Sequence, residues 1–113
     1  APFDLPPLAV CDLSGCLALR ETAPCPALHA LADAAVLALE PCRAPLTEAE
    51  WARRRRGGLS AAAEARVARW GYHLVFEAWR FHVTLTRRLT PGEHAIVRPA
   101  LIAHLGDAPA RVR

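Results

Sequence analysis

The stretch W-R-F-H-V-T-L-T-R, residues Trp79 to Arg87, alternates apolar and polar side chains almost without a break. A repeat of two residues predicts a half-buried β-strand over this stretch. On such a strand Phe81, Val83 and Leu85 point into the core. The opposite face then carries a guanidinium, an imidazole and two hydroxyls, from Arg80, His82, Thr84 and Thr86.

This polar face has the composition of a phosphate-binding site. Alternate residues of a strand lie about 6.6 Å apart, so two neighbours can contact one phosphate. His82 can transfer a proton near neutral pH, and Thr84 can donate a hydrogen bond to a phosphate oxygen. Arg80 can neutralise phosphate charge or pair with Glu77. The competing interpretation is structural, because threonine is common in strands for packing reasons.

The composition is that of a single globular domain. Of the 113 residues, 53% are hydrophobic and 22% charged, which suits one domain with a modest core. The net charge of +3 permits anionic ligands without requiring them. No apolar run approaches the roughly 18 residues of a membrane span, and the start does not resemble a signal peptide. We therefore expect a cytoplasmic location and no membrane partner.

The cysteines do not have metal-site spacing, because none of them forms a C-x-x-C pair. We predict neither a metal nor another cofactor. The number of cysteines alone allows a disulfide framework, but we expect free and mostly buried thiols. The four residues are Cys11, Cys16, Cys25 and Cys42.

The remaining sequence predicts an α+β fold. Strands over 8–13 and 16–20, joined by Ser14-Gly15, form an antiparallel hairpin. Apolar periodicity and capping residues predict four helices, over 26–39, 48–55, 61–70 and 91–105. The expected architecture is a small antiparallel sheet with helices on one face, in a single domain over residues 1–113.

Two expectations concern the C-terminal part. The apolar face of the last helix should hold Ile96, Ala100 and Ala103, with Val97 and Leu101 as further candidates. Residues 107–113 should form a frayed tail.

The segment 70–86 resembles the C-terminal half of a 2H phosphoesterase, a superfamily that includes 2'-5' RNA ligase-like proteins and cyclic phosphodiesterases. Its signature is His-x-Thr/Ser on a strand followed by an apolar residue, here His82-Val83-Thr84-Leu85. The flanking residues, with the runs 2–8 and 43–50, resemble a bacterial branch found beside phosphonate-degradation genes. The resemblance covers most of the chain, and the long run is more specific than the signature.

The resemblance implies a fold of two lobes, each giving one His-x-Thr/Ser strand to a shared cleft. It implies that two histidines act as general acid and base on a cyclic phosphodiester, without a metal. Carried over, His82 is one acid/base residue and Thr84 binds the phosphate, with Thr86 and Arg80 on the same face. Tyr72 is expected near the mouth of the cleft. The implied partner is a small phosphorylated or cyclic-phosphate substrate, or RNA.

This sequence holds only one such motif. The other histidines are followed two positions later by Leu31, Val75, Ile96 and Gly106. The chain also opens without Met. We therefore expect a C-terminal lobe, inactive alone, whose upstream lobe is missing. The second motif would come from that lobe or from a second copy in a homodimer.

Two non-catalytic alternatives stay open. The chain can be a phosphate- or RNA-binding module, with Arg53 to Arg56 as an anion-attracting rim. It can also be a structural lobe that dimerises through an exposed apolar seam. Four arginines at a helix C-terminus also suit the helix dipole, so a solvated helix end is the favoured explanation of this run.

Overall fold

The computed structural model describes residues 2–106 and 111–112. The chain divides into two compact units. We call Ala1–Ala27 with Phe81–Arg113 the sheet unit, and Leu28–Arg80 the helical unit. The expectation of a single domain over residues 1–113 stays a prediction.

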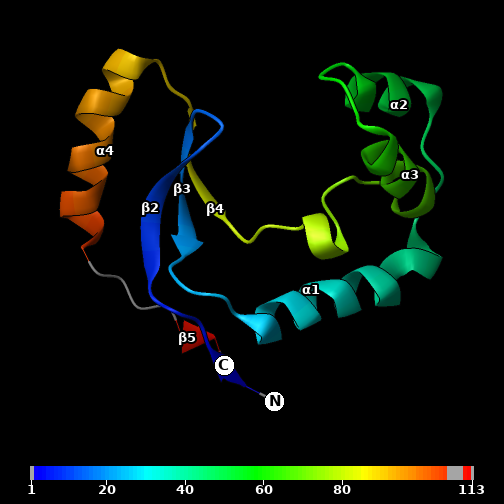
Figure 1. Cartoon of the computed structure of the whole chain (residues 1–113), viewed down its shortest axis with the longest axis horizontal. Helices are drawn as coiled ribbons and strands as arrows, with labels where there is room; N and C mark the ends of the chain where they lie inside the picture. The colour runs from blue at the N-terminus through cyan, green and yellow to red at the C-terminus, as the bar shows by residue number, and fades with distance from the viewer. Residues whose placement is uncertain (1, 107–110, 113) are drawn as a thin grey trace. The chain divides into compact units, whose positions relative to one another are not determined.

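The sheet unit is built on three antiparallel strands in the order β2-β3-β4 (Figure 1). They are β2 (Leu8–Leu13), β3 (Cys16–Glu21) and β4 (Val83–Arg88). Ser14 and Gly15 have φ values of 54° and 92°, as a two-residue hairpin turn requires. The hairpin register runs from Leu8 opposite Glu21 to Leu13 opposite Cys16. The predicted α+β class and its small antiparallel sheet are confirmed.

β4 is shorter at its start than the sequence predicts. The expected strand from Trp79 is wrong, because the described strand begins at Val83. Phe76 has a φ of 53° and begins a 3-10 turn, η2 (Phe76–Ala78). The described pairing with β3 ends at Leu19 opposite Val83, the first residue of the strand. Val83 is also 44% exposed, which corrects its predicted place in the core.

Helix α4 (Pro91–Leu105) lies against β2 (Figure 1). Its bounds agree with the prediction, but its inward face does not. Ile96 is 75% exposed, and Ala100 and Ala103 are exposed as well. His94 turns the other side inward, since its Nε2 lies 3.0 Å from the Gly15 carbonyl oxygen. That rotation brings Val97 and Leu101 to the half-buried side.

A second, two-stranded sheet pairs the ends of the chain. β1 (Phe3–Asp4) is antiparallel to β5 (Arg111–Val112). The predicted frayed tail is therefore wrong for Arg111 and Val112, whose backbone finds a partner. Residues 107–110 and 113 lie outside the described part of the chain.

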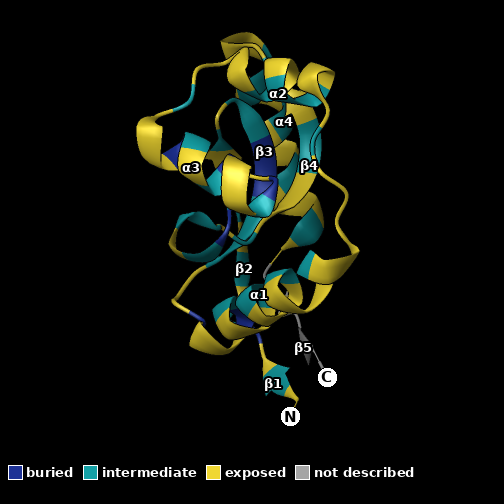
Figure 2. Ribbon diagram, turned by 90° about the vertical axis from the view of Figure 1, so that its right-hand side faces the viewer, coloured by how far each residue is buried: buried dark blue, intermediate teal, exposed yellow. Residues whose placement is uncertain are grey.

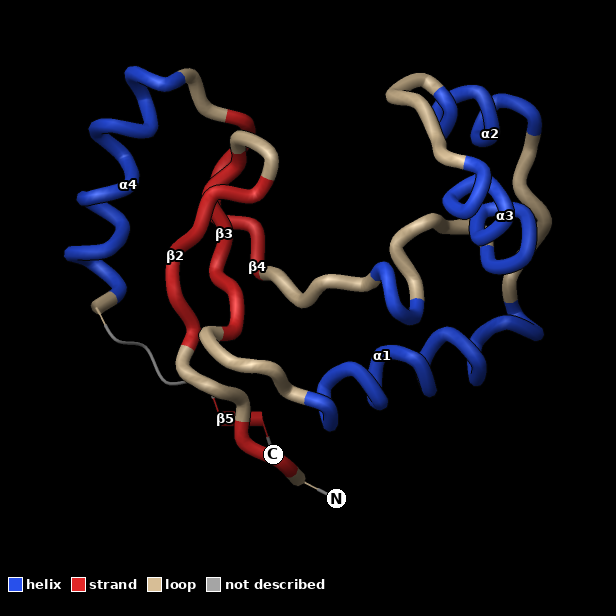
Figure 3. The backbone as a smooth tube through the Cα atoms, in the orientation of Figure 1, coloured by secondary structure: helices blue, strands red, loops and turns tan. Residues whose placement is uncertain are grey.

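The helical unit contains α2 (Glu48–Arg55) and α3 (Ala61–Trp70), and α1 (Pro26–Leu39) begins two residues before it (Figure 3). A second 3-10 turn, η1 (Glu40–Cys42), follows α1. Thr47 and Glu50 form a capping box at the start of α2, and the Ser60 hydroxyl accepts from the Ala63 amide at 3.1 Å. The predicted helices are confirmed. Their caps form between residues close together in the sequence, so the sequence alone indicates where these helices begin.

Few side chains are fully buried. Leu17 and Ala18 on β3 have no exposed surface, and Val67 on α3 is 1% exposed (Figure 2).

All four thiols are free, but only Cys25 is buried and Cys42 is exposed, so the prediction of mostly buried thiols is wrong. No helix in the described ranges is long and apolar enough to cross a membrane.

Candidate functional site

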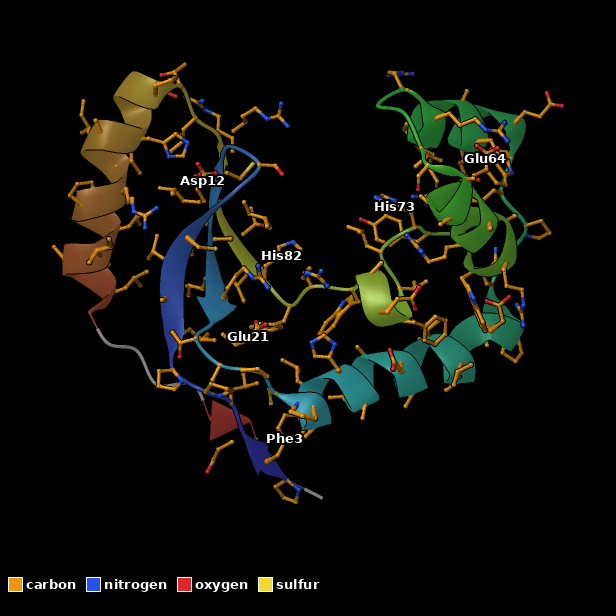
Figure 4. The ribbon with its side chains drawn as sticks, viewed as in Figure 1. Phe3, Asp12, Glu21, Glu64, His73 and His82 are labelled. Atoms are coloured by element: carbon orange, nitrogen blue, oxygen red, sulfur yellow. The ribbon has the colours of Figure 1, made fainter. Side chains whose placement is uncertain are left out.

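His82 and Thr84 lie at the start of β4, which is one of the two outer strands of the three-stranded sheet. His82 directly precedes the strand and Thr84 is its second residue. Thr84 is opposite Ala18 of β3. Both His82 and Thr84 are exposed, so neither side chain is sealed in the apolar interior. Figure 4 shows His82 beside the three-stranded sheet, away from the hairpin turn that follows Asp12.

Arg20 is a further cationic candidate, which the sequence analysis missed. It lies two residues beyond Ala18 on β3, so alternation gives it the face that Ala18 shares with Thr84. Its Nη2 is 3.6 Å from Glu21 Oε1. Its Nε is buried without a hydrogen-bond partner among the described residues. Only the pairing of β3 with β4 reveals this position, and no local pattern encodes that pairing.

The Thr86 hydroxyl has a structural role in the sheet. The Leu17 amide donates a hydrogen bond to Thr86 Oγ1 at 3.0 Å, and the same hydroxyl donates to the Arg87 carbonyl oxygen at 2.7 Å. The register shifts between Cys16 and Ala18, so Leu17 faces a bulge in β4. Thr86 therefore supplies the acceptor that the interrupted ladder lacks.

Arg80 and Tyr72 belong to the helical unit. Arg80 Nη1 donates to the backbone carbonyl oxygens of Glu77 and Trp79, at 3.3 and 3.2 Å. The Glu77 carboxylate instead accepts from Arg66 at 3.4 Å. Tyr72 is 43% exposed. Neither residue joins His82 and Thr84 within one unit, so their predicted role in substrate binding stays a prediction.

The arginine run at the end of α2 is divided between structure and solvent. Arg55 pairs with Glu64 and lies 4.3 Å above the Trp51 ring. Arg54 lies 5.2 Å from the centre of the Tyr72 ring. Arg53 and Arg56 are exposed, and within the described ranges neither has an ion pair or a ring contact of this kind.

Charge pairing fixes the far end of β4. Arg87 makes a bidentate contact with Glu93 of α4, at 2.7 and 3.2 Å. Hydrogen bonds from Arg87, and then from the Thr90 backbone, lower the pKa of Glu93 from 4.5 to about 2.

Within the described ranges, no group of three or more His, Cys, Asp or Glu residues could hold a metal ion.

Comparisons with known proteins give relatives but no structural template. The chain is 40% identical to "Ribose 1,5-bisphosphate phosphokinase PhnN" of Janthinobacterium sp. (strain Marseille) over 99 residues, which is 85% of this chain and 22% of that protein. It is 42% identical to a protein of the same name from Laribacter hongkongensis (strain HLHK9) over 82 residues, 73% of this chain and 18% of that protein. No solved structure matches significantly.

The matched segment is a small part of those relatives, because the chain spans about a fifth of their length. A family profile, in contrast, matches the whole chain, residues 1–113. The chain therefore belongs to the family described as "Protein of unknown function (DUF1045)".

Proposed function

We propose that this chain supplies one His-x-Thr half of a phosphoesterase site that hydrolyses a cyclic phosphate ester without a metal. The observation that carries the proposal is the position of His82 and Thr84. Both are exposed, two residues apart, at the start of an outer strand. An imidazole and a hydroxyl in that place can reach one phosphate from solvent. The cytoplasmic location expected from the sequence remains part of this proposal.

The more general part of the proposal is a role linked to phosphonate metabolism, without a specified reaction. The two relatives that carry the name PhnN support this link. We do not extend their kinase activity to this chain. A phosphate-binding P-loop uses a lysine in the pattern G-x-x-x-x-G-K-[ST], and this sequence contains no lysine at all.

In the proposed reaction, water attacks the phosphorus of the cyclic diester and one ring P–O bond breaks. One group takes the proton of the water, and another gives a proton to the leaving oxygen. His82 fills one of these two roles. Thr84 donates a hydrogen bond to a phosphate oxygen, and Arg20 balances the developing charge from the same face of the sheet.

Replacement of His82 tests the proposal. In the complete protein, His82→Ala should slow hydrolysis of a 2',3'-cyclic nucleotide by about 10²- to 10⁴-fold, the usual contribution of a general acid or base. The matched control is His104→Ala, because His104 is exposed in the last turn of α4. Turnover that is unchanged in His82→Ala would exclude the catalytic role.

The single motif supports a second candidate, a non-catalytic module that binds phosphorylated ligands or RNA. Such binding neutralises phosphates with arginine, so affinity should fall steeply with added salt. Titration of a short RNA at increasing ionic strength measures this. Affinity that does not change with salt would exclude this candidate, whether or not His82 is catalytic.

A further inference from the structure

The helical unit contains a pocket of about 580 Å³. This volume falls in the range of about 300–1,000 Å³ that is usual for sites of small molecules. The rings of Trp70, Tyr72 and Trp79 line it, together with aliphatic side chains such as Val36 and Leu74. The walls are therefore mainly apolar and rich in aromatic surface.

The two tryptophan rings are held from outside the pocket. Trp79 meets the His29 ring edge-on, with centroids 5.0 Å apart and an interplanar angle of 86°. Trp70 contacts Phe76 at 4.8 Å and carries the Arg69 guanidinium 4.0 Å from its ring centre. Fixed walls reduce the conformational entropy that the protein side chains lose when a ligand binds.

A charged cluster adjoins the aromatic walls. Glu40 and Arg43 line the pocket and are joined by two contacts of 3.0 Å. Arg69 also donates to Glu40, at 3.1 Å. Hydrogen bonding to Arg43 lowers the pKa of Glu40, so its carboxylate is ionised at neutral pH. Two guanidiniums around one carboxylate leave a net positive charge of one.

We propose that this pocket binds a nucleotide. The nucleobase of this ligand lies against the aromatic walls, and the phosphate of the ligand faces the cluster of Glu40, Arg43 and Arg69. Aromatic walls suit a flat ring, because each base has a π-face that can stack. The net charge of the cluster favours an anionic group over a neutral one. The site lies wholly within the helical unit and does not depend on a catalytic role for His82.

Tryptophan fluorescence can test this in the full chain. The sequence has three tryptophans, and Trp51 lies outside this pocket. In a Trp51→Phe background the emission reports on Trp70 and Trp79 alone. AMP and adenosine should both quench it, with AMP binding more tightly at low salt, and ribose 5-phosphate should not. Quenching by neither AMP nor adenosine at millimolar concentration would overturn the proposal.

Two variants separate the base from the phosphate. Trp79→Leu should weaken AMP binding by about 5- to 150-fold, which corresponds to about 1–3 kcal/mol per stacked base. Arg69→Gln should weaken AMP binding by a larger factor than adenosine binding, because its guanidinium belongs to the charged cluster as well as packing on the Trp70 ring. Thermal unfolding shows whether each variant is folded. A folded Trp79→Leu protein with the affinity of its parent would contradict the assignment.

The thiol of Cys42 gives a measurement that needs no substitution. Cys42 is exposed and lines the pocket. Bound AMP should slow its alkylation by iodoacetamide, located by peptide mass spectrometry. Cys11 and Cys16, which are half-buried in the sheet unit, are internal controls whose rates should not change. Absence of protection by saturating AMP, or equal protection by ribose 5-phosphate, would rule out a nucleotide-base site.

Discussion

Thr84 and Thr86 are two residues apart on β4, but their hydroxyls have different surroundings. The Thr84 side chain is exposed beside Ala18. The Thr86 hydroxyl accepts from the buried Leu17 and donates to Arg87. Replacing each threonine by valine keeps nearly the same shape and removes only the hydroxyl. The two substitutions therefore separate a proposed ligand contact from a structural hydrogen bond.

Thr84→Val should weaken substrate binding with little change in stability. A hydrogen bond to a charged group contributes about 1.5–3 kcal/mol, which corresponds to about 10- to 150-fold in affinity. Binding of a cyclic nucleotide by the complete protein measures this effect, and denaturant unfolding measures stability. Equal affinity for the variant and its parent would mean that Thr84 does not contact the phosphate.

Thr86→Val should have the opposite profile. It leaves the amide of Leu17, a residue with no exposed surface, without its acceptor. A buried donor without a partner costs about 1–3 kcal/mol of the free energy of unfolding. Denaturant unfolding should show this loss, while ligand affinity stays within about twofold. A variant as stable as the parent would show that water replaces the hydroxyl.

Local alternation is enough to single out His82 and Thr84, but it cannot distinguish Thr84 from Thr86. That distinction depends on the bulge opposite Leu17, which exists only when β4 pairs with β3. Arg20 was missed for the same reason. Tyr72 and Arg80 were grouped with these residues, whereas the structure places them in the other unit.

At the level of elements, capping residues made the helices predictable. The Thr90 amide donates to Glu93 at 2.9 Å, and the helix starts at Pro91 as the sequence indicates. The inward face of α4 was not predictable, because His94 contacts Gly15 and outweighs the apolar pattern around Ile96. A polar contact with another element set the rotation of the helix.

The contact between β4 and α4 should depend on pH. The pKa of Glu93 is lowered from 4.5 to about 2 by hydrogen bonding, chiefly to Arg87. A lowered pKa in the folded state stabilises the fold above the unfolded value, and that stability is lost as pH falls. The stability difference between the parent and Glu93→Gln should therefore be largest above about pH 4.5 and shrink toward pH 2.

Thermal unfolding from pH 7 to pH 2.5 measures this difference. Arg87→Gln is the matched control, because Arg87 is the largest cause of the shift. In that background the Glu93→Gln substitution should produce a much smaller pH-dependent change. A stability difference that stays constant across this range would show that Glu93 titrates normally in the folded protein.

At the scale of the whole molecule, the single His-x-Thr motif limits the chain to one of the two groups that the proposed acid–base reaction needs. Only His82 is followed by a threonine two positions later, among five histidines. The relatives are several times longer than the matched segment. The proposed acid–base pair therefore needs a second group from other residues of a longer protein or from a second copy.

Kinetics can identify the source of that second group. One missing acid or base should slow the 113-residue chain by about 10²- to 10⁴-fold relative to a longer protein that supplies both. If a second copy supplies it, the activity per chain should rise with protein concentration and reach a plateau as dimers form. His82→Ala should slow either activity by about 10²- to 10⁴-fold. A chain that reaches the full rate at all concentrations would show that it holds a complete site, and that the pairing of two His-x-Thr halves is the wrong mechanism.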